Sequence, residues 1–218
     1  AEVNILGSLN VARLSSDYGV SKIINFQTSL CYGIPIENPI RVNHETNPFT
    51  SYGISKTVGE FYMTKMDLPL FSLRLANICS KNLSIGPIPT FYKRIKEGKE
   101  CYCTEAKRDF LDFEDFYELL EKILFGSYEF GIFNVSTGTG NSIKQVFDIV
   151  KNYLGEKNLN VLVKPVNKDD IPIMILDPSH TEAVFDWKPK VSFHEMIIKQ
   201  LKYYDESGII KIFSHLKN

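Results

Sequence analysis

Residues 70–77 read LFSLRLAN, and this pattern sets the architecture that we expect for the chain. Phe71, Leu73 and Leu75 alternate with small or polar residues, and a period of two residues predicts a β-strand. Residues 51–65 predict a helix before this strand, and residues 22–27 predict an earlier apolar strand. Apolar strands that alternate with helices are typical of an α/β fold with a parallel sheet.

After this strand, the regular alternation of apolar strands and helices gives way to shorter, mixed elements. This change near residues 78–88 predicts a domain boundary. Ser142 and Gln145 fit a capping box at the start of one later helix. From the spacing of apolar residues we expect helices at 90–97, 114–124, 142–154 and 192–204, and strands at 100–104, 110–112, 131–135 and 160–164.

The composition excludes several classes of protein. Of the 218 residues, 44% are hydrophobic and 23% are charged, which is ordinary for a globular chain and excludes disorder. The 25 basic and 26 acidic side chains give a net charge of −1, which argues against a nucleic-acid or membrane-surface partner. No apolar run approaches the roughly 20 residues of a membrane span. Four cysteines in this length suggest reduced thiols, and therefore a cytoplasmic protein.

The chain begins at Ala1, inside a segment that already has helical spacing. Val3, Leu6 and Leu9 recur near one turn apart, so we expect a helix over residues 1–16. We interpret the chain as the later part of a longer polypeptide. Cys101 and Cys103 have no ordered Cys or His partners nearby, so no metal site is expected.

Tyr52 and Lys56 are the pair that points most directly to chemistry. Residues four apart lie on one face of a helix, so the Lys56 ammonium can lie beside the Tyr52 phenol. A phenol has a pKa of about 10, and a role as base at neutral pH needs a decrease of roughly 3 units, or about 4 kcal/mol. A neighbouring cation acts in that direction. The alternative is a chance pair on a solvated helix face.

Two further polar residues end the predicted parallel strands. Thr28 follows the strand at 22–27, and Asn77 ends the strand at 70–77. Ligands of open α/β sheets bind beyond the carboxyl ends of strands, so both residues are expected at one crevice with the Tyr52 helix. The alternatives are a satisfied strand-end hydroxyl for Thr28 and a turn residue for Asn77.

Several motifs occur in a fixed order along the chain: Asn4 to Asn10, Thr28 four residues before Tyr32-Gly33, the Tyr52 and Lys56 pair, residues 73–77, and Arg108-Asp109-Phe110 with Asp115 five residues after Phe110. In this order they resemble the extended short-chain dehydrogenase/reductases, specifically the NAD-dependent nucleotide-sugar epimerase/dehydratase family. The amino-acid sequences of residues 26–28 and 86–90 most resemble those of family members from bacterial surface-polysaccharide and O-antigen loci.

The resemblance implies the C-terminal part of a Rossmann-like sheet in residues 1–82 and a nucleotide-sugar-binding lobe in residues 83–218. It also implies bound NAD, a nucleotide-diphosphate sugar as substrate, and a transient keto-sugar that is epimerised or dehydrated. The resemblance implies that Thr28, Tyr52 and Lys56 are catalytic. It implies that these three residues also bind the cofactor, together with Asn4 and the backbone at Ala76. It assigns substrate binding to Asn77 and Arg108.

Arg108 has a simpler reading. A guanidinium suits bidentate contact with phosphate, but Arg108 can equally form an ion pair with Asp109 or Asp115. Asp115 can also serve only as the cap of the helix that starts there. A reductase for another alcohol is a further alternative, which the Arg108 segment disfavours.

The chain departs from the family's pattern in two places. It contains no G-x-x-G-x-x-G turn, so on the order of ninety residues in βαβ units are expected in front of it. As given, it is not expected to hold the NAD pyrophosphate in the usual way. Ser29 and Leu30 stand where dehydratases often carry Asp and Glu, which favours an epimerase. A dehydratase and a truncated, non-catalytic relative stay as alternatives.

The resemblance also predicts an assembly. The helices at residues 1–16 and 51–65 correspond to the pair that forms a four-helix interface in the family. We therefore expect a homodimer.

Overall fold

A computed structural model describes residues 2–167 and 170–209 of the chain; Ala1, the first residue of the helix predicted over residues 1–16, lies outside the described residues. Three parallel strands form the main sheet in the order β1 (Ile23–Thr28), β2 (Leu70–Leu75) and β7 (Gly131–Val135). Thr28 pairs with Leu75, and Leu75 pairs with Val135, so the carboxyl ends of the three strands lie at one edge. The prediction of a parallel α/β sheet is confirmed.

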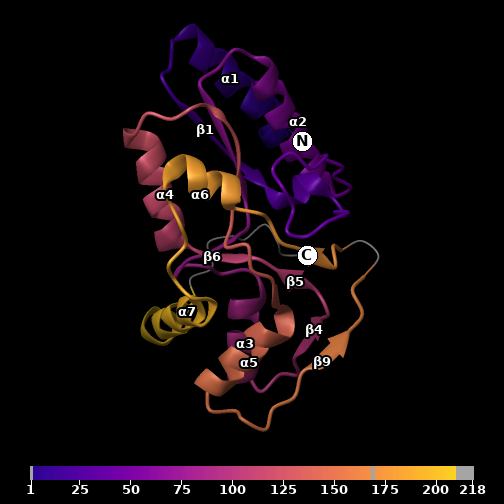
Figure 1. The fold of residues 1–218 in the computed structure, drawn as a ribbon. Coiled ribbons are helices and arrows are strands. Elements are labelled where there is room, and N and C mark those ends of the chain that lie inside the picture. Colours follow the sequence, from indigo (N-terminus) through magenta and orange to yellow (C-terminus); the bar gives the residue numbers. More distant parts are fainter. Residues whose placement is uncertain (1, 168–169, 210–218) are drawn as a thin grey trace.

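Helices cover both faces of this sheet. The first helical segment is η1 (Glu2–Gly7), a π-helix that continues into α1 (Ser8–Asp17), and both pack with α2 (Ser51–Lys65) at one end of the molecule (Figure 1). Met63 of α2 joins a small core with the sheet residues Ile23 and Leu70. Phe71 and Leu73 point the other way, into a core shared with α4 (Phe113–Phe125) and α6 (Ser179–Phe185).

One lysine links the start of the sheet to the end of a helix. Lys22 precedes β1, and its Nζ donates to the carbonyls of Ile123 (2.9 Å), Leu124 (2.9 Å) and Gly126 (2.5 Å). These carbonyls belong to the last turn of α4 and the residue that caps it, where intrahelical donors are missing. A cation at a helix C-terminus is also favoured by the helix dipole.

The second lobe is built around helices α3 (Pro87–Lys96), α5 (Ile143–Tyr153) and α7 (Phe193–Ser207), which lie together in Figure 1. Phe91, Phe147 and Ile197 from these helices share one buried core. The predicted capping box is confirmed, because the side chains of Ser142 and Gln145 each bond to the other residue's backbone N–H. The lobe's short strands are β4 (Tyr102–Thr104) with β9 (Leu162–Lys164), and β5 (Lys107–Arg108) between β8 (Asn141–Ser142) and β10 (Ile173–Met174).

Two segments lie elsewhere than the sequence suggests. β7 falls in the range 83–218, yet it pairs with β2, so the chain returns to the main sheet after building part of the second lobe. The predicted boundary at residues 82–83 therefore does not follow the sheet. Asn77 does not extend β2; it begins β3 (Asn77–Cys79), which pairs with β6 (Phe110–Asp112). The N–H of Ala76 donates to Val135, where the chain leaves one ladder for the other.

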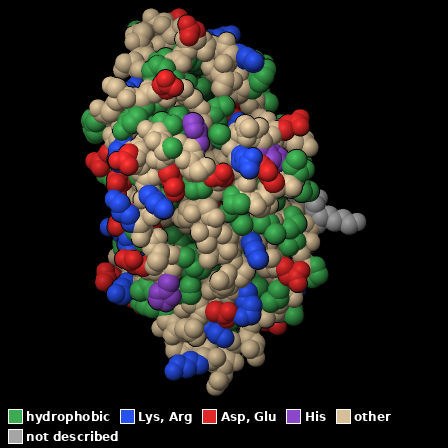
Figure 2. Space-filling model, viewed as in Figure 1, with side chains coloured by type: hydrophobic (Ala, Val, Ile, Leu, Met, Phe, Trp, Pro, Cys, Tyr) green, Lys and Arg blue, Asp and Glu red, His purple; other side chains and the backbone are tan. Residues whose placement is uncertain are grey.

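The surface carries charges of both signs. Figure 2 shows acidic and basic side chains interspersed over the face in view. Within the described ranges, no helix combines the length and the apolar character that a bilayer crossing requires.

Candidate active site at the strand ends

Thr28 lies at the carboxyl end of β1, as predicted. Its Oγ1 accepts a hydrogen bond from Leu30 N at 3.2 Å and so caps the short 3-10 helix η2 (Ser29–Tyr32). A hydroxyl that accepts from the backbone keeps its own hydrogen for another partner. The Thr28 hydroxyl therefore has a structural partner at the end of the strand, as the alternative expected. Its own hydrogen is still available to donate to a ligand.

Gln27 joins the end of β1 to helix α2. Its Nε2 donates to the carbonyl of Lys56 at 3.0 Å, and its Oε1 accepts from Thr28 N at 2.8 Å. Gly53 makes the helix approach possible, because a Cβ at this position would lie 2.9 Å from the carbonyl oxygen of Leu30. The turn of α2 that carries Tyr52 and Lys56 is thus held against the segment that begins at Thr28.

Tyr52 and Lys56 lie one turn apart on α2, whose first turn is capped by Thr50 Oγ1. The Tyr52 side chain is half exposed and Lys56 is partly buried. Partial burial raises the pKa of Tyr52 above its ordinary value. Partial burial also lowers the pKa of Lys56, which the negative charge of Glu60 opposes. The direction for Tyr52 is opposite to the one that we expected from its lysine neighbour, because the shift comes from loss of water around the phenol and the Lys56 charge is not among its causes.

Asn4 lies against the same helix. Its Nδ2 donates to Ser55 Oγ at 3.0 Å, and Ser55 Oγ donates to the Tyr52 carbonyl at 3.0 Å. The π-helical segment can approach closely because a Cβ on Gly59 would lie 2.5 Å from the Asn4 carbonyl. Single turns of π-helix are frequent at functional sites. Cofactor binding by Asn4 stays a prediction.

Asn77 lies where β2 ends and β3 begins, and its side chain is exposed. Its backbone N and its Nδ2 both donate to the carbonyl of Asp109, each at 3.0 Å. The backbone N–H of Ala76 is already bonded to Val135, so only its carbonyl stays available for a cofactor. Asn77 is held close to the residue that follows Arg108, which brings the two predicted substrate ligands into one neighbourhood.

Arg108 has a partner that the sequence did not suggest. Its Nη2 contacts Asp170 Oδ1 at 2.7 Å, and its Nη1 donates to the carbonyl of Lys107 at 2.9 Å. The expected alternatives were wrong, because the carboxylates of Asp109 and Asp115 are engaged elsewhere. Burial lowers the pKa of Arg108, and Asp170 opposes that decrease.

Asp115 and Asp109 both have structural roles. Asp115 is buried and accepts from Val191 N at 2.9 Å, while the cap of α4 is Asp112, whose Oδ1 accepts from Glu114 N at 2.8 Å. The expectation that Asp115 caps this helix was therefore wrong. Asp109 accepts three hydrogen bonds from Thr137 and Gly138, a role that sequence spacing did not reveal.

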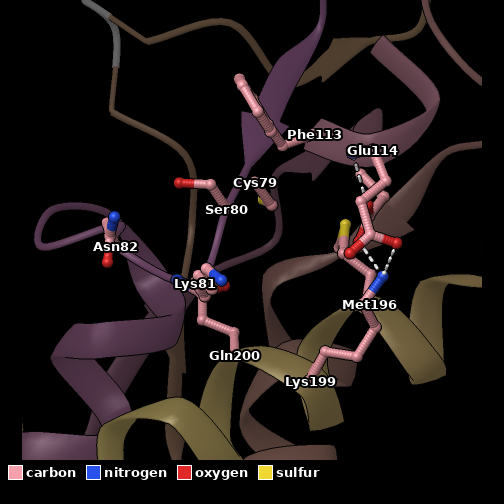
Figure 3. Close-up of a pocket in the computed structure, with 10 residues that line it drawn as sticks. Cys79, Ser80, Lys81, Asn82, Phe113, Glu114, Met196, Lys199 and Gln200 are labelled. Atoms are coloured by element: carbon pink, nitrogen blue, oxygen red, sulfur yellow. Dashed lines mark hydrogen bonds and ion pairs between the residues drawn. The ribbon is translucent and has the colours of Figure 1, made fainter. Parts of the chain in front are cut away.

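A separate cavity of about 240 Å³ lies at the carboxyl ends of β3 and β6 (Figure 3). Lys199 contacts Glu114 at 2.6 Å and Asp112 at 3.4 Å along one wall, and Ser80 and Lys81 lie on another. Asn77 and Phe110 begin β3 and β6, so this cavity lies at the opposite end of that strand pair from the candidate site. Within the described ranges, no group of three or more His, Cys, Asp and Glu residues could hold a metal ion.

Thr28 lies at the carboxyl end of β1 in a parallel sheet, and Tyr52 and Lys56 lie on the adjoining helix. This arrangement defines the class of extended short-chain dehydrogenase/reductases. The family model described as GDP-mannose 4,6 dehydratase matches residues 1–200. The chain therefore belongs to this family of nucleotide-sugar epimerases and dehydratases, and its fold is Rossmann-like, as the resemblance implied.

Similar proteins come from bacteria, an archaeon and rice. The crystal structure of the Bordetella bronchiseptica enzyme WbmG in complex with NAD is 51% identical, with a TM-score of 0.92, over 99% of this chain and 69% of that one. The B. bronchiseptica enzyme WbmH in complex with NAD+ is 32% identical, with a TM-score of 0.86, over 94% of this chain and 69% of that one.

A putative UDP-glucose 4-epimerase of Methanocaldococcus jannaschii is 26% identical over 208 residues, which are 90% of this chain and 67% of that protein. The chain spans 60% and 55% of the lengths of the next two curated relatives that it matches.

Proposed function

We propose that the protein acts as an NAD-dependent nucleotide-sugar epimerase. The observation that carries this proposal is the approach of the Tyr52–Lys56 turn to Thr28, fixed by the Gln27 side chain and by Gly53. The similarity to WbmG, whose crystal structures are complexes with NAD and with NAD and UDP, supports the choice of cofactor and of a nucleotide ligand.

The donor set of the site fits the nicotinamide end of NAD. Asn4, Lys56 and the Ala76 carbonyl offer donors and acceptors for ribose and amide groups, and the chain supplies no glycine-rich turn for the pyrophosphate. Bound NAD supplies an acceptor for a hydride from the sugar carbon. Lys56 then adds a positive charge beside Tyr52.

The reaction at the sugar uses two hydroxyl groups of the protein. Thr28 donates its free hydrogen to the reacting hydroxyl and holds it in place. Tyr52 takes the proton of that hydroxyl as the carbon is oxidised, and returns a proton when the keto-sugar is reduced on its other face. Because burial raises the pKa of Tyr52, its activation depends on positive charge from Lys56 and from the oxidised nicotinamide ring.

Asn77 and Arg108 are the proposed ligands of the diphosphate. The exposed Asn77 amide donates one hydrogen to Asp109, which leaves its second hydrogen for a phosphate oxygen. Arg108 is held by Asp170, so a diphosphate shares or replaces that contact. Arginine suits this role because its planar guanidinium matches phosphate oxygens.

An epimerisation fits better than a dehydration. A dehydration needs an acid and a base at the sugar in addition to Tyr52. Ser29 is buried and Leu30 is apolar at the positions after Thr28, so neither supplies a carboxylate. The dehydratase alternative therefore needs catalytic groups from another part of the molecule.

We also propose a cytoplasmic homodimer that serves surface-polysaccharide biosynthesis. The four cysteines are free thiols and buried, which supports a reducing compartment. Exposed apolar side chains on α1 and α2, among them Leu14 and Phe61, support an interface between two copies. The similarity to WbmG and WbmH supports the wider role.

The substitution Tyr52→Phe tests the proposed function. We expect the rate of UDP-sugar epimerisation to fall by about 10³-fold or more, because the proton acceptor is lost. NMR of the product measures this rate. UDP binding, measured by calorimetry, is expected to stay within about twofold because the diphosphate ligands are unchanged.

Tyr62→Phe on the same helix is the matched control, since Tyr62 is outside the site. Full turnover by Tyr52→Phe would refute the proposal. UDP binding with no turnover in the unchanged protein would instead favour the non-catalytic alternative.

A further inference from the structure

A buried ion pair lies behind the Tyr52–Lys56 turn. Glu60 on α2 and Arg74 on β2 are 4% and 6% exposed, and Arg74 Nη2 contacts Glu60 Oε2 at 2.8 Å. Arg74 Nε and Ser72 Oγ donate to Glu60 Oε1 at 3.3 and 2.6 Å. Removing two charges from water costs several kcal/mol per ion, and an apolar pair often stabilises a fold equally well. The ion pair therefore adds little to the free energy of unfolding once the cost of removing both charges from water is included.

Arg74 joins this pair to the segment that follows Thr28. Its Nη1 donates to the Tyr32 hydroxyl at 3.0 Å, and that hydroxyl donates to Asn134 Oδ1 at 2.7 Å. Tyr32 is the last residue of η2, the short helix that Thr28 caps. One buried guanidinium thus contacts both elements whose relative placement makes the candidate site.

Glu60 also acts on Lys56 directly. It follows Lys56 by four residues, so the two side chains lie on one face of α2, one turn apart. Partial burial lowers the pKa of Lys56, and the negative charge of Glu60 raises it. The elements that pack on α2 carry these other titratable or charged groups: Glu2 on η1, Arg13 and Asp17 on α1, Cys31 and Tyr32 on η2, and Arg74 on β2.

We propose that Glu60 is a positioning residue for the reaction: anchored by Arg74 and Ser72, it fixes the face of α2 that carries Tyr52 and Lys56 and supplies the counter-charge of the Lys56 ammonium. The charge of Glu60 is needed near Lys56, and Arg74 and Ser72 make its burial possible. The proposal rests on the role of Lys56 in the proposed function and adds a residue outside the recognised motifs of the site.

The test measures the reactivity of Lys56 in the chain itself. Glu60→Gln combined with Arg74→Met removes both charges together, so neither is left buried without its partner. At a fixed mildly alkaline pH, we expect an amine-acetylating reagent to modify Lys56 roughly threefold faster or more. The charge of Glu60, and not that of Arg74, is among the causes that set the Lys56 pKa, so the deprotonated fraction grows as the ammonium loses its counter-charge. Peptide mass spectrometry follows the rate.

Two controls separate charge from stability. Lys65, in the last turn of the same helix, is expected to react at the wild-type rate in the double variant. Ser72→Ala removes the hydrogen bonds of this hydroxyl with Glu60 and Asn25 and no charge, so it is expected to lower the melting temperature and leave the Lys56 rate unchanged.

An unchanged Lys56 rate in a folded double variant would overturn the proposal. Should that variant not fold, Glu60→Asp provides the test: it withdraws the carboxylate by one methylene, and a Lys56 rate equal to that of the wild type would refute the assignment. The measurement needs neither cofactor nor turnover. Its failure is therefore distinct from failure of the proposed function, which Tyr52→Phe decides.

Discussion

Asp109 shows how much a single carboxylate depends on its surroundings. It is almost fully buried, and it accepts hydrogen bonds from Thr137 N at 3.0 Å, Thr137 Oγ1 at 2.7 Å and Gly138 N at 2.9 Å. Burial outweighs these bonds and raises the pKa of Asp109 to about 6 from an ordinary 3.8. The carboxylate holds the turn after β7 against the strand that carries Arg108.

The raised pKa of Asp109 predicts a pH dependence of stability. The folded protein binds the proton more tightly than the unfolded chain, so the contribution of Asp109 is present below about pH 4 and is lost as the pH rises through about 6. The difference amounts to roughly 3 kcal/mol at most. Urea unfolding at several pH values should show this decline in the wild type relative to Asp109→Asn. A difference between the two proteins that stays constant from pH 4 to 7 would contradict it.

At the scale of elements, Gly53 controls how closely α2 packs on η2. Glycine in a helix usually costs about 0.5–1 kcal/mol relative to alanine. Here a Cβ would lie 2.9 Å from the Leu30 carbonyl and 3.0 Å from Thr50 Oγ1, and the carbonyl belongs to the backbone. We expect Gly53→Ala to lower the free energy of unfolding by about 1–3 kcal/mol, because α2 must shift.

Gly7→Ala is the matched control for this substitution. A Cβ on Gly7 has its nearest neighbour at 4.0 Å, and the residue already has helical backbone angles. Denaturant unfolding should therefore show no loss of stability for this variant. A stable Gly53→Ala would mean that η2 can move away without cost.

Elements with strong local signals were predictable from the sequence. Helix α2 and strand β7 have the predicted bounds, since Thr50 caps the helix and the apolar period marks the strand. Strands β5, β8 and β10 are two residues long and have no period to detect. The helix expected over residues 1–16 is divided into a π-helix and an α-helix, a distinction that apolar spacing does not make.

The site was predictable in part for the same reason. Thr28, Tyr52 and Lys56 lie where strand ends and helical spacing placed them, and the family resemblance assigned their roles. The partner of Arg108 is 62 residues away, and no local pattern joins it to Asp170. Likewise, Glu60 and Arg74 meet only when α2 packs on β2, so their pairing emerges from the tertiary structure.

At the scale of the whole molecule, α1 and α2 lie side by side (Figure 1). Both helices leave apolar side chains exposed. Leu14 on α1 and Phe61 on α2 are each 55% exposed. We expect light scattering to give twice the chain mass for the wild type. Leu14→Glu with Phe61→Glu is expected to give the mass of one chain, because charges would be buried at the interface.

Phe125→Glu is the control for the assembly. Phe125 is 85% exposed at the end of α4, a helix that is not part of the proposed interface, so its replacement should leave the mass unchanged. Both variants should keep the wild-type circular dichroism spectrum, since the replaced side chains are exposed. A wild-type protein with the mass of one chain would contradict the proposed homodimer.

The contact of Lys22 with α4 has a consequence for how the molecule opens. It ties residue 22 to carbonyls about one hundred positions later in the chain, so the last turn of α4 cannot fray without releasing the entry to β1. Segments bound in this way exchange their amide hydrogens together, as one cooperative unit. The strand that leads to Thr28 is therefore coupled to the opening of a distant helix, and a single ammonium group provides that link.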